Sequence, residues 1–551
     1  MANYIEGQLV DIHVREIYPA RVTWNEVGII VSIEKLAHAP KNYIMPGFVD
    51  AHIHIESTMM HPQHFAKAVR RHGTIATVSD PHEIGNVLGV EGVEYMINAS
   101  KDLPISINYG VPSCVPAAPG LERSGAIIDS EKVQYLFDTY DLKYLAEMMN
   151  FPGVVNDDSE VLQKLKIAKE SKKVIDGHAP MLSGEGLQKY ILEGISTDHE
   201  CTTLEEALEK IEAGMKIMIR EGSAAKNYEA LKELIRLHPG QIMLCSDDAH
   251  PDQLIDGHIN RYVARILNDG FEFWDVLNIA CKHPVEHFSL DIGTLKIGDP
   301  ADFIIVENLE SFPVQGFYRK GKSIEEKDIE NLELSTEDVP NHFHLNDISM
   351  DEFEQLMPDW KIKRSGEWNI IQVIDQQLLT HKKVITFEGS IEELLQKHPE
   401  YSVLLVINRY QKEVEIQACI VENFGDIQGV LGSSVMHDCH NLILVGRDPV
   451  LIHKALSTLI ENKGGLVAVK NDGTVHDLPL AIAGLMSIEP IETLAEKFIA
   501  LEKVVGEMKS ELTAPFMTLS FLALPVIPSL KLTDLGLFDS DLFEFVVGIP
   551  E

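Results

Sequence analysis

The chain has 551 residues and a mass of 61.6 kDa, more than one hydrophobic core usually supports, so we expect at least two domains. Its 85 acidic and 47 basic residues give a formal net charge of -38, which would repel both a nucleic-acid backbone and an anionic membrane surface. We therefore expect no nucleic-acid partner and no membrane partner, and a small or neutral substrate is favoured.

Cysteine usage and the first residues of the chain indicate the compartment. The six cysteines are widely scattered and form no C-x-x-C pair, so neither a disulfide framework nor a thiolate zinc site is predicted. Residues 1 to 20 mix charges into a strand-like pattern without the apolar run of a signal peptide. No later stretch approaches the roughly 18 uncharged apolar residues of a membrane span. We expect a protein of the reducing cytoplasm.

Between residues 43 and 250, short β-rich runs that end in polar residues alternate with helix-like stretches. Eight runs occur, at residues 43–55, 74–80, 104–114, 144–150, 172–179, 194–201, 216–223 and 241–248. Eight strands that alternate with helices predict a (β/α)8 TIM-like barrel over residues 43–289. The polar residues fall at the carboxyl ends of the strands, where such barrels carry their chemistry.

Strand-rich segments flank the predicted barrel at residues 1–42 and 290–335, and we expect them to pair as one small composite β-sandwich. The acidic and polar stretch 323–348 is typical of a linker or an elaborated loop. A further region, residues 349–551, is predicted to be a C-terminal α/β domain, with strand candidates at 401–410, 441–448 and 465–473. The fold class is therefore α/β in all parts except the flanking sandwich.

The first run contains GFVDAHIHIE, in which His52 and His54 are separated by one residue. Positions i and i+2 of a strand face the same side, so these two imidazoles can meet at one ion. Taken alone, the pair is weak evidence, because paired histidines in strands also occur as ordinary half-buried residues.

Other predicted strands also end in histidine or carboxylate. His178 ends the fifth run, His199 the sixth and Asp247 the eighth. Imidazole nitrogens and carboxylate oxygens at several strand ends form a metal-ligand set, which core packing alone does not explain. Glu147 ends the fourth run and could bridge two ions. The sequence therefore predicts a metal site; the alternative is a set of individually hydrogen-bonded polar residues at a barrel rim.

Longer stretches extend this pattern, among them HGTIATVSDPHEIGNVLG (72–89), DGHAPMLSGEGLQKYI (176–191), CSDDAHPDQLIDGHI (245–259) and SSVMHDCHNLILVG (433–446). In these stretches and their order, the chain resembles the adenine deaminase family of the amidohydrolase superfamily. The resemblance covers almost the whole chain. It implies an enzyme that hydrolyses adenine to hypoxanthine and ammonia in purine salvage.

The resemblance also implies two divalent metal ions, with manganese first and iron or zinc as alternatives. Many members of the superfamily use a carboxylated lysine as the bridging ligand, but here Lys143 lies four residues before Glu147, at the far end of the strand. Carried over residue by residue, the ligands are His52, His54 and Asp247 for one ion, His178 and His199 for the other, and Glu147 for both.

Deamination needs a hydroxide that attacks C6 of adenine and a proton that reaches N1 of the ring. A bound metal ion would supply the hydroxide, because it lowers the pKa of water. Asp247 is expected to carry the proton of this water to the departing amine. The acid for N1 stays open among four residues near strand ends, each of which could instead orient a ligand histidine: His82, Glu83, Glu200 and Asp248.

Three features outside this set receive simpler interpretations. His437 and His440, in the motif HDCHN, are predicted to fix a turn or the interface to the barrel rather than to form a second metal site. Glu56 and Glu122 are expected at the surface or as supports of a ligand. The apolar run 516–532 is interrupted by prolines and is predicted to pack inside the C-terminal domain.

Competing functions remain open. The alternative is a related amidohydrolase that acts on a cyclic amide or on another aminopurine, and a cyclic-amide hydrolase would more typically carry lysine at the bridging strand. A non-catalytic binding protein would have lost a ligand. Cytidine-type zinc deaminases carry H-x-E with P-C-x-x-C, and the sequence contains no such cysteine pair. We expect the substrate to be free adenine or a small nucleoside, and the protein to be a homo-oligomer.

Overall fold

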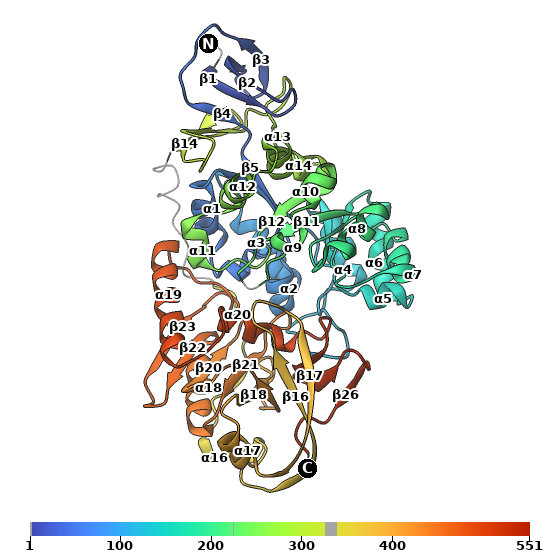
Figure 1. The fold of residues 1–551 in the computed structure, drawn as a ribbon, viewed down its shortest axis with the longest axis vertical. Helices are drawn as coiled ribbons and strands as arrows, with labels where there is room; N and C mark the ends of the chain where they lie inside the picture. Colours follow the sequence, from blue (N-terminus) through green and yellow to red (C-terminus); the bar gives the residue numbers. More distant parts are fainter. Residues whose placement is uncertain (1–2, 224, 326–338, 551) are drawn as a thin grey trace.

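The computed structural model describes residues 3–223, 225–325 and 339–550, which form three bodies along one long axis (Figure 1). A small sheet lies at one end, residues 48–288 form the middle, and the C-terminal region lies at the other end. Part of the predicted linker, residues 326–338, lies outside the described residues. Among the helices that the structure describes, none combines the length and the apolar character needed to cross a membrane.

The small sheet combines the two segments that flank the middle body. It has seven strands in the order β15-β14-β13-β4-β1-β2-β3. The prediction of a sandwich is wrong in this detail, because β4 pairs with β1 on one side and with β13 on the other and so joins both segments into one sheet. The strands are β1 Asn3–Asp11, β2 Glu16–Trp24, β3 Ile30–Lys35, β4 Tyr43–Met45, β13 Phe303–Val306, β14 Val314–Arg319 and β15 Lys322–Ser323.

The first predicted barrel strand, 43–55, is divided in two. Its start is β4 of the small sheet, and β5 (Phe48–Ile53) begins after Pro46 and Gly47. Proline lacks an N–H for a ladder, which favours a break here. A Cβ at Gly47 would lie 2.6 Å from Cβ of Ile75, so the chain passes close to the next strand at this break.

Each of the eight predicted runs contains a strand of the middle body, and all the pairings between these strands are parallel. Regular ladders join β5-β6-β7, β8-β9 and β10-β11-β12, while bridges Val111–Leu145, Ile175–Ile195 and Asp247–Ile53 connect these groups in chain order and return to β5. The strands after β5 are β6 Thr74–Ser79, β7 Ser106–Tyr109, β8 Tyr144–Met148, β9 Val174–Gly177, β10 Thr197–Asp198, β11 Lys216–Arg220 and β12 Ile242–Cys245.

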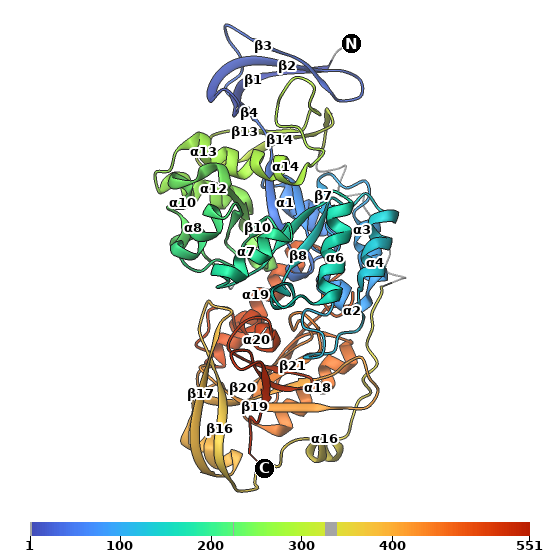
Figure 2. The ribbon, with the colours of Figure 1, turned by 90° about the vertical axis from the view of Figure 1, so that its right-hand side faces the viewer.

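Helices lie around the outside of these strands (Figure 2). Several begin at side-chain caps that the sequence supplies; in α6, Asp158 accepts hydrogen bonds from the backbone N–H groups of Glu160 and Val161. The helices are α1 Pro62–Arg70, α2 His82–Leu88, α3 Val90–Ala99, α4 Ser130–Thr139, α5 Phe151–Val155, α6 Ser159–Glu170, α7 Gly184–Leu192, α8 Leu204–Glu212, α9 Tyr228–Leu231, α10 Leu234–Leu237, α11 Pro251–Asp256, α12 Ile259–Asn268, α13 Phe273–Leu277 and α14 His283–Phe288.

The C-terminal region is built on an eight-stranded sheet in the order β17-β16-β19-β18-β21-β20-β22-β23. The three strand candidates in this region correspond to β18, β21 and β22. Helix α18 (Pro449–Asn462) packs on one face of the sheet. The strands are β16 Arg364–Val373, β17 Thr380–Gly389, β18 Tyr401–Ile407, β19 Ile416–Glu422, β20 Gly429–Ser433, β21 Leu442–Gly446, β22 Gly465–Lys470 and β23 Val475–Pro479.

The rest of the C-terminal region packs against this sheet. The predicted apolar run is buried as expected, from Phe516 through Leu524, in α20 and the turn that follows it. A second sheet has three strands, β24 to β26. These elements are α16 Met350–Leu356, α17 Ile391–Lys397, α19 Ile491–Glu507, α20 Pro515–Ser520, the 3-10 helix Phe521–Ala523, β24 Leu530–Thr533, β25 Gly536–Asp539 and β26 Glu544–Val546.

Asp50 joins β5 to β12 where the ring of strands returns to its start. It is fully buried and accepts hydrogen bonds from the Ser246 backbone N–H, at 3.1 Å, and from the Ser246 hydroxyl. Nε2 of His258 lies 2.9 Å from the second carboxylate oxygen. One side chain therefore accepts two hydrogen bonds from Ser246 and lies within ion-pair distance of His258.

Asp50→Ala is expected to lower the free energy of unfolding by about 2 to 3 kcal/mol, because the buried N–H and O–H groups of Ser246 would lose their acceptor. Asp50→Asn keeps one oxygen and the side-chain shape, so its loss should be smaller. Thermal and urea unfolding of the two variants and the wild type measure the difference. Equal stability of the alanine variant and the wild type would contradict this role.

Candidate active site

The six predicted metal ligands lie together at the carboxyl ends of the strands. They come from β5, from β8 and from the first residues after β9, β10 and β12, and because all these strands are parallel their ends meet on one side. All six are at most 4% exposed. They are His52, His54, Glu147, His178, His199 and Asp247.

His52 and His54 direct their Nε2 atoms to one point. Nδ1 of His52 lies 2.9 Å from the Asp176 carboxylate, and Nδ1 of His54 lies 3.2 Å from the carbonyl oxygen of Asp80. Both partners only accept hydrogen bonds, so each Nδ1 carries a proton and each Nε2 is the ring atom that faces a possible ion. The two Nε2 atoms are nevertheless only 3.1 Å apart.

Carboxylate oxygens complete this first group of acceptors. Nε2 of His54 lies 3.2 Å from Oε1 of Glu147 and 3.2 Å from Oδ1 of Asp247. Two ionised carboxylates so close together in a buried site repel each other unless a positive charge lies between them. The donor set fits a divalent cation bound by nitrogen and oxygen ligands.

Glu147 faces a second group with its other oxygen. Oε2 lies 2.8 Å from Nδ1 of His178 and 3.3 Å from Nε2 of His199. One carboxylate therefore has one oxygen in each group, which is the position required of a bridging ligand. Lys143 pairs instead with Asp141 and Asp291, at 2.9 and 3.2 Å, and does not belong to either group.

The field of the carboxylates favours positive charge at this point. Burial lowers the pKa of His52, but Asp176 and Glu147 outweigh it and raise that pKa to about 10. Burial likewise opposes the charged form of His178, yet Glu200 and Glu147 raise its pKa to about 9. The pKa of Glu147 is held well below its usual value, against the effect of burial, by His178 and its neighbours. A metal cation would be stabilised by the same field.

Arg220 is a functional candidate that sequence reasoning missed. It ends β11, and its guanidinium binds both oxygens of Glu200, one of them at 3.1 Å. The same guanidinium lies 2.5 Å from Oδ2 of Asp247. The signal was its place at the end of the seventh run, the same position that identified the ligands. Arg220 neutralises Glu200 and fixes the orientation of Asp247.

All four candidates for the N1 acid line one cavity together with the ligands: His82, Glu83, Glu200 and Asp248. His82 Nδ1 lies 2.9 Å from Asp80, and Asp248 accepts a hydrogen bond of 2.6 Å from the hydroxyl of Ser57. The structure thus brings every predicted site residue except His52 to the lining of one cavity. His52 lies next to it, with its Nε2 3.1 Å from Nε2 of His54.

The C-terminal region supplies part of this cavity, and the residues of HDCHN form the predicted interface to the barrel. Nδ1 of His437 lies 2.7 Å from Oε1 of Glu83, and Nε2 of His440 contacts Oε2 of the same carboxylate. Oδ2 of Asp438 lies 3.7 Å from Nε2 of His82, and Phe521 stacks on His437. These residues do form the interface, but they also face the cavity.

Glu56 and Glu122 are both buried, which rules out the surface alternative and leaves that of supporting residues. Glu56 accepts a 3.2 Å hydrogen bond from the backbone N–H of Ile84, in the helix that begins with His82 and Glu83. Burial raises the pKa of Glu56 to about 7. Its role is to hold the start of α2 in place. Glu122 accepts a hydrogen bond from the backbone of Ala118.

Two family models match the chain: the amidohydrolase family over residues 43–324, and the adenine deaminase C-terminal domain over residues 377–544. The adenine deaminase of Salinibacter ruber is 45% identical over 546 residues, which cover 98% of each chain. That of a Sulfurovum species is also 45% identical, and that of Borreliella afzelii is 43% identical; each alignment covers 98% of this chain and 99% of the relative. The chain belongs to the adenine deaminase family.

The similarity to the adenine deaminase family extends over the C-terminal region. The C-terminal model spans both His437 and Phe521, and the amidohydrolase model spans all six predicted ligands. Both matched regions therefore line the same cavity. Among solved structures, the β-aspartyl dipeptidase of Fervidobacterium islandicum aligns with 59% of this chain and 96% of its own at 13% identity, with a TM-score of 0.43.

Glu147→Gln is expected to reduce the divalent metal bound per chain, because a neutral amide replaces the one carboxylate that faces both groups of ligands. Elemental analysis after dialysis measures the bound metal. Glu221→Gln is the matched control, since Glu221 is another buried carboxylate at a strand end but pairs with Arg265, 2.7 Å away. Metal content equal to that of the wild type in Glu147→Gln would exclude a bridging role.

Proposed function

We propose that this protein is an adenine aminohydrolase, which converts adenine and water to hypoxanthine and ammonia. The observation that carries the proposal is the double group of ligands around Glu147, in a chain whose relatives at 41 to 45% identity are named adenine deaminases. A cyclic-amide hydrolase with a lysine bridge is disfavoured, because Lys143 lies away from the ligands and pairs with two aspartates.

The proposal includes two divalent ions, with manganese first and iron or zinc as alternatives. His52, His54 and Asp247 would hold one ion, His178 and His199 the other, and Glu147 both. When bound, these ions supply a hydroxide nucleophile at neutral pH, because a divalent cation lowers the pKa of water.

Asp247 is proposed to move the proton of the attacking water. Its Oδ1 faces the first group of ligands, while its Oδ2 lies 2.5 Å from Arg220. Arg220 holds the carboxylate in one orientation, so Asp247 can accept a proton on the side of the cavity and return it to the leaving amine. The carboxylate therefore ends each cycle in the protonation state in which it began.

Glu83 is the preferred donor of a proton to N1 of adenine. Glu200 is held at both oxygens by Arg220, which leaves it no free oxygen for the substrate. Glu83 contacts His437 and His440, which hold its pKa well below the usual value against the effect of burial. It would therefore pass to N1 a proton received from one of these imidazoles. Asp248 and His82 are the alternatives, in that order.

Three broader statements belong to the same proposal. The ring of eight parallel strands is a (β/α)8 barrel of the TIM type over residues 43–289, flanked by 1–42 with 290–335 and followed by 349–551. The enzyme acts in the cytoplasm as a homo-oligomer, and it serves purine salvage. Free adenine is its substrate.

Protein loaded with manganese is expected to release ammonia from adenine in equal amount to the hypoxanthine formed. Loss of adenine absorbance and an independent ammonia assay measure the two products. Iron-loaded and zinc-loaded protein are the comparison. Failure of all three metals with adenine, together with hydrolysis of a hydantoin or a dihydropyrimidine, would replace this function by cyclic-amide hydrolysis.

Glu83→Gln is expected to lower kcat about a hundredfold or more, the usual loss when a general acid is removed. Bound metal should stay at the wild-type level, because Glu83 lies outside both groups of ligands. Asp248→Asn is the matched variant. If Asp248→Asn carries the larger loss and Glu83→Gln keeps its kcat, Asp248 is the proton donor instead.

A further inference from the structure

The cavity that holds the ligands is closed in this structure. Every residue that lines it is buried, except Asp248, which is partly buried. The side chains on the C-terminal side of the cavity are at most 8% exposed: Leu378, His437, Asp438, Phe521, Leu524 and Ile527. A substrate can therefore reach the ligands only where part of this lining moves aside.

A second, larger pocket lies directly outside the cavity. Met181, which lines it, is 61% exposed, and Lys226, Gln376 and Gln377 are exposed as well, so this pocket opens to solvent. Its volume is about 330 Å³, against about 20 Å³ for the inner cavity. Four residues line both spaces: Glu200, Arg220, Leu378 and Ile527. These four residues form the partition between the two spaces.

The two halves of the partition differ in how firmly they are held. On the barrel side, Glu200 and Arg220 are joined by two hydrogen bonds, and Arg220 is also bound to Asp247. Moving this pair would break buried charge-assisted contacts. On the C-terminal side, Leu378 and Ile527 offer only apolar side chains, which change rotamer at small cost. Opening is therefore easiest at Leu378 and Ile527.

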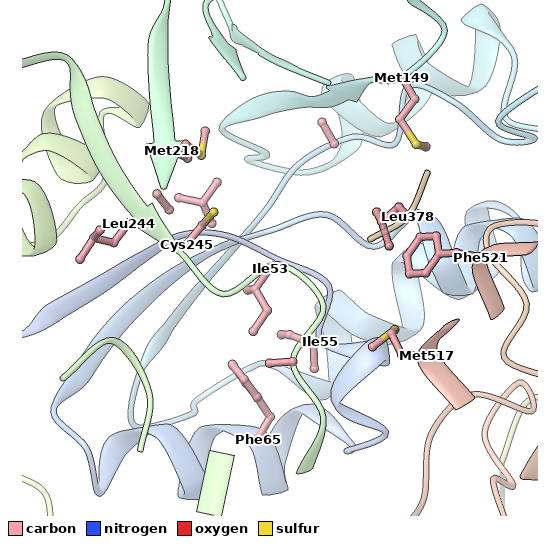
Figure 3. Packing of buried hydrophobic residues seen from close by; sticks show 14 of the residues in the cluster. Ile53, Ile55, Phe65, Met149, Met218, Leu244, Cys245, Leu378, Met517 and Phe521 are labelled. Atoms are coloured by element: carbon pink, nitrogen blue, oxygen red, sulfur yellow. The ribbon is translucent and has the colours of Figure 1, made fainter. Parts of the chain in front are cut away.

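The backbone beneath Leu378 is anchored. Nζ of Lys531, which is fully buried, donates hydrogen bonds to the carbonyl oxygens of Leu378, at 2.7 Å, and Phe521, at 2.9 Å. Burial lowers the pKa of Lys531 to about 7. Figure 3 shows the side chains of Leu378 and Phe521 beside each other, with Met149 nearby. With its main chain fixed, Leu378 can open the partition only through its side chain, which limits the width of the opening.

We propose that the outer pocket is the entrance to the active site and that Leu378 and Ile527 select substrates by size at the partition. A flat purine base without a bulky substituent passes, and adenine derivatives extended at N9 are held back. This inference rests on the proposed deaminase function and adds two specificity-determining residues to it. Neither residue offers a group that could take part in the chemistry.

The test compares adenine with 9-ethyladenine as substrates. In Leu378→Ala, the ratio of kcat/KM for 9-ethyladenine to that for adenine is expected to rise about tenfold or more, the effect of changing a few methylenes in an apolar pocket. Leu379→Ala is the matched control, because Leu379 lines the outer pocket but not the inner cavity, and its ratio should match the wild type. Ile527→Val tests the same partition with a milder change and should move the ratio in the same direction.

Bound metal and the thermal midpoint of each variant show that its site and fold are intact. A ratio unchanged from the wild type in both Leu378→Ala and Ile527→Val overturns the inference while the deaminase function stands. An equal rise in Leu379→Ala also overturns it, because the selection would then lie in the outer pocket. Wild-type protein that does not deaminate adenine overturns the proposed function, and this inference with it.

Discussion

The site depends on one electrostatic constraint: four acceptor atoms from three strands meet at one buried point. Nε2 of His52 and of His54 are 3.1 Å apart, and carboxylate oxygens of Glu147 and Asp247 lie 3.2 Å from the latter. Such an arrangement is unfavourable unless positive charge lies among these atoms, because buried carboxylates lose solvation and repel each other. The strand ends that carry these residues are therefore expected to be held firmly by the rest of the fold.

Hydrogen bonds with neighbouring residues hold the ligand side chains in place. Asp176 and the carbonyl of Asp80 fix the two imidazoles, and Arg220 fixes the carboxylate of Asp247. Asp247 itself adopts a left-handed backbone conformation, with φ of 52°, which costs a non-glycine residue free energy. Backbone hydrogen bonds on both sides, to His52 and from His54, hold it there. The ring of strands closes at this residue, so the hydrogen bonds that close the ring also position Asp247 as a ligand.

Sequence reasoning found the six ligands because two local signals coincide in each: the residue type and the position at the end of a β-rich run. It missed Arg220 because arginine is not a metal ligand, and its role appears only when Glu200 and Asp247 are seen on either side of it. The pairing of strands also shows which sheet a segment joins, which the hydrophobic pattern of the sequence does not show. Residues 43–55 look like one strand, yet β4 pairs in the small sheet and β5 in the ring. The prediction of a sandwich was wrong for the same reason, because the sequence does not show that β4 pairs with strands of both flanking segments.

The contact of HDCHN with the barrel was predicted, but its partner Glu83 was not, since nothing local in the motif says which side chain it meets. The strand β18 shows how the contact is built. Leu405 belongs to the core under α16 to α18, while Leu404 and Val406 belong to the large core that also contains the barrel residues. Alternating residues of one strand thus serve two cores. The face that carries His437 toward Glu83 is continuous with the barrel core, so separating the two regions would expose that core and also remove one side of the active site.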